Sequence, residues 1–269
     1  MRKSSKKIRI MKFLKKSLGQ NFLIDKNIVK KIINLADIKN KNLIEIGPGN
    51  GALTDEILKE RPKTLILIEK DNYFAAELRK KYSNEKCVSI FNVDFLKFNI
   101  EKKIRPNSIV FGNLPYNISS QILVKLIKFK WPPKYNDLIL MFQKELGEKI
   151  ISNFKSNNYG RLSVLTNLRL SPQKKFFVSA NSFFPKPKVT SMIIHFKTKK
   201  DSSKIKNIKN LEEITNIFFS NKRKMINKNI KKILNKEKIM KLTNLDLNNR
   251  PTDINPETYY KITELFEKG

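Results

Sequence analysis

The sequence has very little of the residue types that build the commonest catalytic and metal centres. Its 269 residues include one cysteine, Cys87, and one histidine, His195. A single cysteine excludes an intramolecular disulfide and a cysteine-rich zinc site, and it is typical of proteins from a reducing compartment. We therefore predict no metal site, and we expect Cys87 and His195 to have structural roles.

Long hydrophobic runs are missing as well. No stretch approaches the roughly 18 apolar residues of a membrane-spanning helix, and the basic N-terminal segment lacks the apolar core of a secretory signal. The composition, 40% hydrophobic with 10% aromatic residues, nevertheless supplies enough apolar surface for a core. These features predict a cytoplasmic protein that does not associate with membranes.

Acidic residues are scarce relative to basic ones. The chain carries 56 Lys and Arg against 24 Asp and Glu, which gives a formal net charge of +32. A compact chain with this charge repels itself unless a polyanion neutralises it, and nucleic acids gain affinity from each neutralised phosphate. A compositional bias toward lysine would not by itself remove the acidic residues, so the charge favours nucleic-acid binding. It does not distinguish RNA from DNA.

Short apolar runs alternate with helical patterns over roughly the first 160 residues. The predicted strands are 43–46, 64–68, 88–93, 108–111 and 138–142. The predicted helices are 24–35, 52–58, 72–82, 119–129 and 145–154. This alternation is typical of an α/β fold with a parallel sheet and crossover connections.

The pattern changes after about residue 159. Residues 175–178 and 189–196 are predicted strands that can pair antiparallel, and from about residue 204 only helical patterns remain. These helices are predicted at 211–219, 224–234 and 256–266. The lysine- and serine-rich segment 197–206 marks the boundary between the two regions. We predict a flexible basic leader at 1–16, an α/β domain at 17–200 and a small helical domain at 201–269.

A glycine-rich turn, Gly-Pro-Gly-Asn-Gly at 47–51, follows the first predicted strand. Glycine lets the backbone turn sharply and approach a ligand closely. Glu69 ends the second strand 22 positions after Gly47, close to the spacing at which an acidic side chain accepts hydrogen bonds from a ribose. Asp94 ends the third strand at the same edge of the sheet. The pattern predicts a ribose-bearing cofactor, and a nicotinamide dehydrogenase remains an alternative because the looser dinucleotide fingerprint is also satisfied.

The tetrad Asn113-Leu114-Pro115-Tyr116 follows the fourth predicted strand. The exocyclic amino group of adenine is a poor nucleophile because its lone pair is delocalised into the ring. Two acceptors, the Asn113 side-chain oxygen and a backbone carbonyl, would hold this nitrogen toward tetrahedral geometry. Pro115 removes a backbone donor, and the Tyr116 ring can stack on a base, which contributes about 1–3 kcal/mol in comparable contacts. The alternative is an ordinary proline turn with a buried tyrosine.

Together these motifs make the chain similar to the ribosomal RNA adenine N6,N6-dimethyltransferases of the small-subunit, kasugamycin-sensitivity type. The matching segments are 17–23, 45–49, 53–54, Glu69, Asp94, 111–119, 184–189 and Ser191, with a weaker match at 222–225. The resemblance implies a Rossmann-like S-adenosyl-methionine methyltransferase sheet, mostly parallel with an antiparallel last strand. It also implies a small all-helical C-terminal domain that binds RNA.

The resemblance implies a role for several residues by position. Those expected to bind S-adenosyl-methionine are Asn21, Leu23, Gly47, Gly49, Glu69, Asp94 and Asn113. Those expected at the catalytic centre are Asn113, Leu114, Pro115 and Tyr116. Tyr116, with Phe183 or Phe184, is expected to stack on the target adenine. The residues expected to contact RNA phosphates are Lys222, Arg223 and Lys224.

The implied reaction is dimethylation of the N6 amino groups of two adjacent adenosines near the 3′ end of small-subunit ribosomal RNA, during ribosome biogenesis. We expect a monomer that acts on the pre-small ribosomal subunit. The alternatives are a large-subunit dimethylase of the antibiotic-resistance type, a DNA adenine methylase, and a non-catalytic assembly factor that binds ribosomal RNA. The intact tetrad argues against loss of activity, and a dehydrogenase has no use for it.

Overall fold

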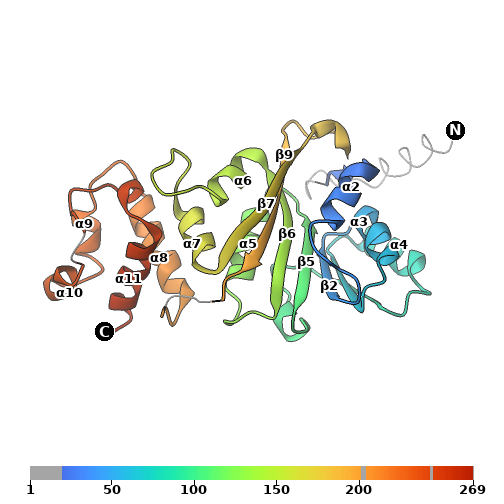
Figure 1. Cartoon of the computed structure of the whole chain (residues 1–269), viewed down its shortest axis with the longest axis horizontal. Helices are drawn as coiled ribbons and strands as arrows, with labels where there is room; N and C mark the ends of the chain where they lie inside the picture. Colours follow the sequence, from blue (N-terminus) through green and yellow to red (C-terminus); the bar gives the residue numbers. More distant parts are fainter. Residues whose placement is uncertain (1–19, 201–203, 243–244, 269) are drawn as a thin grey trace. The chain divides into compact units, whose positions relative to one another are not determined.

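The structure, a computed structural model, describes residues 20–200, 204–242 and 245–268, and it divides into two compact units (Figure 1). Within the described residues, unit 1 comprises 20–125, 129–147 and 172–198. Unit 2 comprises 126–128, 148–171 and the described residues from 199 onward. The predicted leader at 1–16 lies outside the described residues. None of the helices in the described ranges has the length and apolar character needed to span a bilayer.

Unit 1 is built on a seven-stranded sheet with the strand order β4-β3-β2-β5-β6-β9-β7 (Figure 1). The strands are β2 (Asn42–Ile46), β3 (Thr64–Glu69), β4 (Val88–Asn92), β5 (Ser108–Asn113), β6 (Tyr135–Gln143), β7 (Leu170–Val178) and β9 (Ser191–Thr198). Neighbours from β4 to β6 pair in parallel, whereas β9 pairs antiparallel with β6. The prediction of a mostly parallel sheet with an antiparallel last strand is confirmed.

A small second sheet joins two segments that are far apart in the sequence. Strand β1 (Phe22–Leu23) pairs antiparallel with β8 (Phe183–Phe184), so that Phe22 faces Phe184 and Leu23 faces Phe183. The sequence does not predict this pairing, because two-residue strands carry no alternation pattern. The pairing fixes the N-terminal segment against the loop that precedes β9.

Two helices of the sheet domain begin at an aspartate whose side chain caps the first turn. The helices of this domain are α2 (Lys26–Ile33), α3 (Ala52–Lys59), α4 (Asn72–Lys81), α5 (Ser119–Ile127) and α6 (Lys144–Ile150), with short 3-10 turns η2 (Ile100–Lys102) and η3 (Ala180–Ser182). The Asp25 carboxylate accepts hydrogen bonds from the first turn of α2, and Asp71 does the same for α4. Such caps satisfy N–H groups that have no partner inside the helix.

The core of unit 1 lies on both faces of the sheet, which explains why the central strands β2, β3, β5 and β6 are apolar along most of their length. On one face, Leu43, Leu67 and Phe111 pack in a single cluster with buried residues of α2, α3 and α4. Val110 and Leu140, which point to the other face, are also fully buried. Burial on both faces leaves the ends of the strands as the place where polar side chains gather.

The carboxyl ends of the four parallel strands β2 to β5 lie level with one another. Ile46 is in register with Ile68 on one side and with Gly112 on the other, and Glu69 is in register with Asn92. The turns that follow these strands therefore open at one edge of the sheet. Ligands of open α/β sheets bind at this edge.

Unit 2 is helical. Its helices are α7 (Arg161–Arg169), α8 (Ile208–Phe219), α9 (Asn227–Ile230), α10 (Lys236–Met240) and α11 (Pro256–Phe266), with the 3-10 turn η4 (Pro251–Asp253). Helices α7, α8 and α11 pack on one another, and the rings of Phe218 and Tyr259 meet edge to face with centroids 5.5 Å apart. The Tyr259 hydroxyl donates a hydrogen bond to the Pro251 carbonyl at 2.8 Å, so η4 is held against this cluster.

Two predictions for the helical region differ from the structure. The helix predicted at 224–234 is too long, because α9 ends at Ile230 and the chain continues in turns with bonds such as Lys232 N to Asn229 O. Helix α7 was not predicted. Its polar residues Ser163 and Thr166 are buried along with its apolar ones, so it shows no amphipathic stripe.

Candidate functional site

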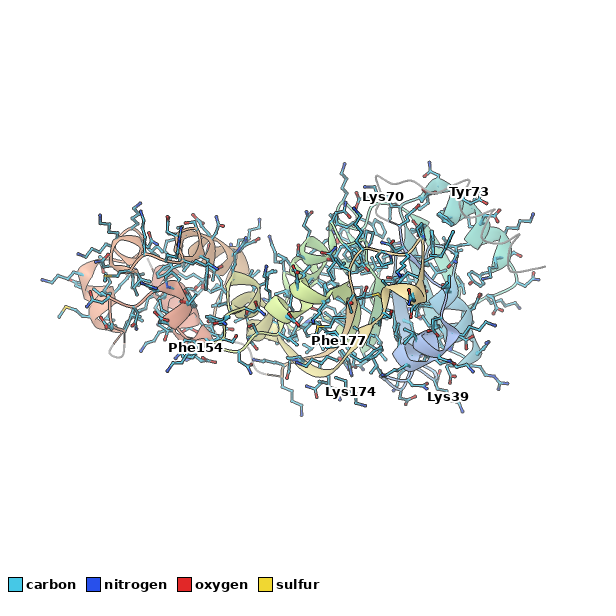
Figure 2. The ribbon with its side chains drawn as sticks, turned by 90° about the horizontal axis from the view of Figure 1, so that it is seen from above. Lys39, Lys70, Tyr73, Phe154, Lys174 and Phe177 are labelled. Carbon is cyan, nitrogen blue, oxygen red and sulfur yellow. The ribbon has the colours of Figure 1, made fainter. Side chains whose placement is uncertain are left out.

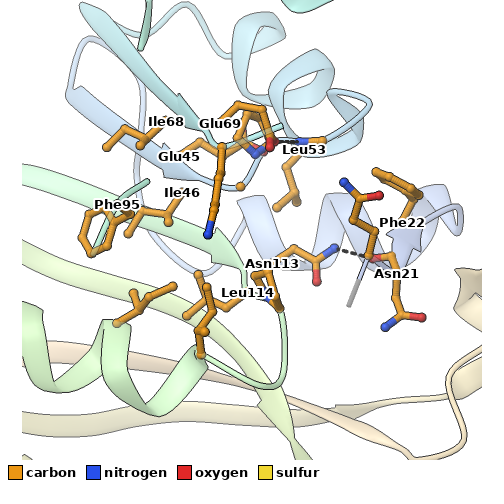
Figure 3. A pocket seen from close by; sticks show the side chains of 18 of the residues that line it. Asn21, Phe22, Glu45, Ile46, Leu53, Ile68, Glu69, Phe95, Asn113 and Leu114 are labelled. Carbon is orange, nitrogen blue, oxygen red and sulfur yellow. Dashed lines mark hydrogen bonds between the residues drawn. The ribbon is translucent and has the colours of Figure 1, made fainter. Parts of the chain in front are cut away.

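A pocket opens at the carboxyl edge of the parallel strands, between the turns that follow β2, β3, β4 and β5 (Figure 3). The N-terminal segment at 20–23 closes it from another side. The predicted site residues that line it are Asn21, Leu23, Gly47, Gly49, Glu69, Asp94, Asn113, Leu114, Pro115 and Tyr116. Lining residues that we did not predict include Glu45, Lys70 and Phe95. Lys70 and Phe95 directly follow the predicted residues Glu69 and Asp94, and Glu45 lies two positions before Gly47.

The glycine turn after β2 requires glycine for two reasons. Gly47 and Gly49 have φ angles of +68° and +55°, which residues with a Cβ rarely adopt. A Cβ added to Gly49 would lie 2.6 Å from Cε1 of Phe22, so there is no room for it. A Cβ on Gly47 would meet only the Asn113 backbone oxygen, at 3.7 Å. The mouth of the glycine turn therefore lies directly beside residue 113.

Glu69 ties the turns after β2 and β3 together. Its side chain is buried, and one carboxylate oxygen accepts a hydrogen bond from the backbone N–H of Gly49 at 2.9 Å (Figure 3). The other oxygen accepts one from the backbone N–H of Asp71 at 2.8 Å. Burial raises the pKa of Glu69, and these two N–H groups oppose that rise. Because each oxygen has a second lone pair, the fixed carboxyl can still accept hydrogen bonds from a ligand.

Glu45 is an acidic residue inside the apolar strand β2. It is 1% exposed, and its carboxyl accepts a hydrogen bond from the Thr54 hydroxyl of α3 at 2.6 Å. Burial raises the pKa of Glu45 to about 8, and the negative charges of Asp55 and Glu69 add to the rise. Glu45 therefore holds a proton at neutral pH, which leaves the floor of the pocket less negative than the sequence suggests.

Asp94 remains ionised at the mouth of the pocket. One carboxylate oxygen accepts a hydrogen bond from the Leu96 N–H at 2.9 Å, and the other forms an ion pair with the Lys70 ammonium at 2.9 Å. This pairing with Lys70 lowers the pKa of Asp94. The carboxylate is thus an acceptor for hydrogen bonds at the carboxyl edge, and the Phe95 side chain beside it adds an apolar wall.

The loop that carries Asp94 and Phe95 is held by one lysine of α5. The Lys125 ammonium donates hydrogen bonds to three backbone carbonyls, those of Phe95 at 2.6 Å, Leu96 at 2.9 Å and Phe98 at 2.8 Å. An ammonium has three N–H donors, so each finds one acceptor. Burial lowers the pKa of Lys125. The sequence gives no signal for this contact, since about 30 residues separate the partners.

Asn113 ends β5 with its side-chain amide in a defined orientation. The amide nitrogen donates a hydrogen bond to the Asn21 backbone carbonyl at 3.1 Å (Figure 3). The bond assigns the nitrogen to that side, so the side-chain oxygen is the atom directed to accept from a ligand. Pairing of β1 with β8 thereby contributes to the orientation of Asn113, because it positions the segment that carries Asn21.

Tyr116 is held by its hydroxyl, which shares a hydrogen bond with the Ser191 hydroxyl at 2.5 Å. Its side chain is partly buried, and burial raises its pKa. Ser191 is the first residue of β9, so a strand far along the sequence fixes this ring. A neutral phenol with a fixed ring can serve for stacking rather than for proton transfer.

The remaining predicted residues do not line the pocket. Phe183 is 3% exposed and packs in the core, whereas Phe184 is only partly buried. Lys222, Arg223 and Lys224 are exposed in unit 2, in the turn after α8. His195 lies on β9, where its Nε2 contacts the Asp137 carboxylate at 2.6 Å. No group of three potential metal ligands exists among the described residues.

Comparison with known proteins identifies the family. A family model for ribosomal RNA adenine dimethylase matches residues 11–268. The ribosomal RNA small subunit methyltransferase A of Pelagibacter ubique (strain HTCC1062) is 44% identical over 259 residues, which cover 94% of this chain and 97% of that protein. The crystal structure of a dimethyladenosine transferase from Plasmodium falciparum has a TM-score of 0.75 at 26% identity and covers 92% of this chain and 98% of its own. The crystal structure of the 23S rRNA methyltransferase ErmE, at 22% identity and a TM-score of 0.66, covers 91% of this chain and 99% of its own and shows the same fold. This chain belongs to the ribosomal RNA adenine dimethylase family.

Proposed function

We propose that this protein transfers methyl groups from S-adenosyl-methionine to the N6 amino groups of two adjacent adenosines near the 3′ end of small-subunit ribosomal RNA. The proposal rests on the position of Asn113. This residue lies beside the glycine turn, and its side-chain oxygen is the atom directed to accept a hydrogen bond from a ligand. The substrate follows from the relative at 44% identity, which is named for the small subunit. The likeness to ErmE, below 25% identity, bears only on the fold.

The pocket residues fit the methyl donor, which supplies a methyl group on a positively charged sulfur. The bare backbone of Gly47 offers a surface that a Cβ would otherwise fill, and it would pass close to the methionine part. The fixed carboxyl of Glu69 would accept hydrogen bonds from the ribose hydroxyls, and Asp94 would accept one from the adenine amino group. Asn21 and Leu23 would line the site from the N-terminal segment.

The chemistry of the target requires positioning more than acid–base catalysis. The Asn113 side-chain oxygen and the Leu114 carbonyl would accept the two N–H bonds of the target amino group and turn its lone pair toward the methyl group. Attack then forms an N–C bond while the C–S bond of the donor breaks. Holding reacting atoms at near-attack distance contributes about 7–11 kcal/mol. The nitrogen becomes acidic only after this step and releases its proton to water.

The target adenine has to leave its stack before it can enter the pocket. Extrusion costs a few kcal/mol, less in a loop than in a duplex. The Tyr116 ring, held through Ser191, would recover part of this cost by stacking, with Phe184 as the candidate for the opposite face because it is the less buried of the two phenylalanines. After the first transfer one N–H remains, so Asn113 and Leu114 would hold the base with a single hydrogen bond.

Unit 2 would supply sequence-independent contacts with RNA phosphates. Lys222, Arg223 and Lys224 are exposed in one turn, and phosphate contacts position a substrate without reading its bases. We further propose that the protein is a monomer and that it acts in the cytoplasm, where its ribosomal RNA substrate is found. Sedimentation of the purified protein tests the monomer.

The test is to incubate the protein with labelled S-adenosyl-methionine and small ribosomal subunits that lack the modification, and then to map the labelled nucleotides. We expect label on N6 of two adjacent adenosines near the 3′ end of the small-subunit RNA. Purified large subunits and duplex DNA are the parallel substrates. Preferential label on large-subunit RNA would favour the resistance-type alternative, and label on DNA would favour a DNA methylase. Absence of label with intact cofactor binding would favour a non-catalytic assembly factor.

A further inference from the structure

An exposed aromatic side chain lies on β7, the edge strand of the sheet in unit 1. Phe177 is 54% exposed, more than any other phenylalanine in the described part of the chain (Figure 2). An exposed apolar ring on an edge strand is a liability for aggregation unless it has a partner.

Basic side chains lie on both faces of the strand that carries this ring. The Lys144 ammonium lies 5.2 Å from the centroid of the Phe177 ring, and the Lys31 ammonium lies 4.2 Å from that of the neighbouring Phe176. Lys174 and Lys175 precede the two phenylalanines on the same strand. Because side chains alternate along a strand, Lys175 shares a face with Phe177. A flat ring among ammonium groups matches a nucleotide, with its base on the ring and its phosphate on a lysine.

The contacts of β9 connect this surface to the pocket. Tyr116 of the pocket bonds to Ser191, and Ser191 is in register with Gln143 of β6. The next residue, Lys144, donates its backbone N–H to the Thr190 carbonyl at 2.9 Å, and its ammonium lies over Phe177. The ring of Phe177 is therefore linked to Tyr116 through one short path at the carboxyl edge of the sheet.

We propose that Phe177 and Lys144 form a platform for an unpaired nucleotide that flanks the target adenine. This inference rests on the proposed function, since it concerns the same RNA substrate. The base stacks on the Phe177 ring and replaces the cation–π contact, which is weak at an exposed site. The released Lys144 ammonium then meets a phosphate of the strand. The platform holds the RNA while the target base occupies the pocket.

The test measures methyl transfer to unmodified small subunits at saturating S-adenosyl-methionine, with the subunit concentration varied. We expect Phe177→Ala to raise KM about 5- to 10-fold, within the range for loss of one stacked base, while kcat stays within about twofold. Phe177→Trp keeps a stacking ring and restores KM. Its added fluorescence should be quenched by RNA, beyond any change at Trp131 in the wild type. Phe266→Ala, which removes another exposed phenylalanine, is the matched control and leaves KM unchanged.

The lysine has a separate signature. Lys144→Met should reduce the slope of log affinity against log salt by about 1, because one phosphate contact is lost, whereas Phe177→Ala should leave this slope unchanged. Circular dichroism and thermal unfolding verify that each variant is folded.

Three results overturn the platform: a Phe177→Ala KM within twofold of wild type, an equal rise for Phe266→Ala, or a changed oligomeric state of Phe177→Ala with unchanged RNA affinity. The last would mean that the ring contacts a second copy of the chain. Absence of methyl transfer by the wild type refutes the proposed function itself, whereas normal wild-type turnover with an unaffected Phe177→Ala refutes the platform alone.

Discussion

Replacing Glu45 by glutamine should change how the stability of unit 1 depends on pH. Burial raises the pKa of Glu45 from its ordinary value of 4.5 to about 8. Between pH 4.5 and pH 8, Glu45 therefore holds its proton in the folded state and has lost it in the unfolded state. The contribution of Glu45 to stability is greatest below pH 4.5 and is lost as the pH rises toward 8. Glutamine does not titrate, and it can still accept the hydrogen bond from Thr54.

The size of the effect follows from the pKa difference. Each pKa unit of difference corresponds to about 1.4 kcal/mol of unfolding free energy. Relative to pH 4.5, titration of Glu45 therefore lowers the unfolding free energy by about 2 kcal/mol at pH 6 and by about 5 kcal/mol above pH 8. We therefore expect wild type and Glu45→Gln to unfold with similar free energies near pH 4.5. The variant should become progressively more stable than the wild type as the pH rises.

Urea unfolding followed by the fluorescence of Trp131 measures this difference. Trp131 is the only tryptophan in the sequence and lies in the same unit as Glu45, so its signal follows the relevant unfolding step. Glu60→Gln, a change at an exposed carboxylate after α3, is the control and should track the wild type at every pH. Parallel stability curves for wild type and Glu45→Gln between pH 5 and 8.5 would refute the reasoning.

Three further variants separate parts of the account. Gly49→Ala puts a residue with a Cβ into a left-handed conformation, which costs about 1–2 kcal/mol, and it displaces Phe22. We therefore expect a lower melting temperature and weaker S-adenosyl-methionine binding, and an unchanged melting temperature would contradict the geometry of the turn. Lys125→Met removes the ammonium that donates to three carbonyls of the loop after Asp94. Calorimetric titration should then find an S-adenosyl-methionine affinity about tenfold lower, with partial recovery in Lys125→Arg. An affinity equal to that of the wild type would mean that the loop keeps its conformation without Lys125. Arg223→Glu should weaken ribosomal RNA binding in a filter-binding assay while S-adenosyl-methionine affinity stays the same; equal loss of both would count against separate roles for the two units.

The sheet was predictable because its signals are local. The run Leu43-Ile44-Glu45-Ile46 and the run 64–68 are short, apolar and followed by turn or charged residues, and the structure has β2 and β3 there. The cap at Asp25 is an equally local signal, because this residue directly precedes α2. Parallel strands then place the residues after them at one edge, which is why Glu69 and Asn113 line one pocket.

What could not be predicted depends on contacts between distant segments. The bond from Asn113 to Asn21 spans 92 positions and that between Tyr116 and Ser191 spans 75, and no spacing rule connects such residues. The same holds for the hydrogen bonds of Lys125 with the loop after Asp94. Helix α7 was missed for a different reason, since burial on all sides erases the periodicity on which the prediction depends.

The central claim is that the Asn113 amide oxygen positions the target nitrogen. It is tested most directly by single-turnover methyl transfer with Asn113→Ala, using unmodified small subunits and labelled S-adenosyl-methionine. We predict that, with S-adenosyl-methionine at saturating concentration, the rate falls about 100- to 1,000-fold, as when a preorganised hydrogen-bonding group is removed from an active site, while the protein stays folded. A rate within a few-fold of wild type would contradict the claim.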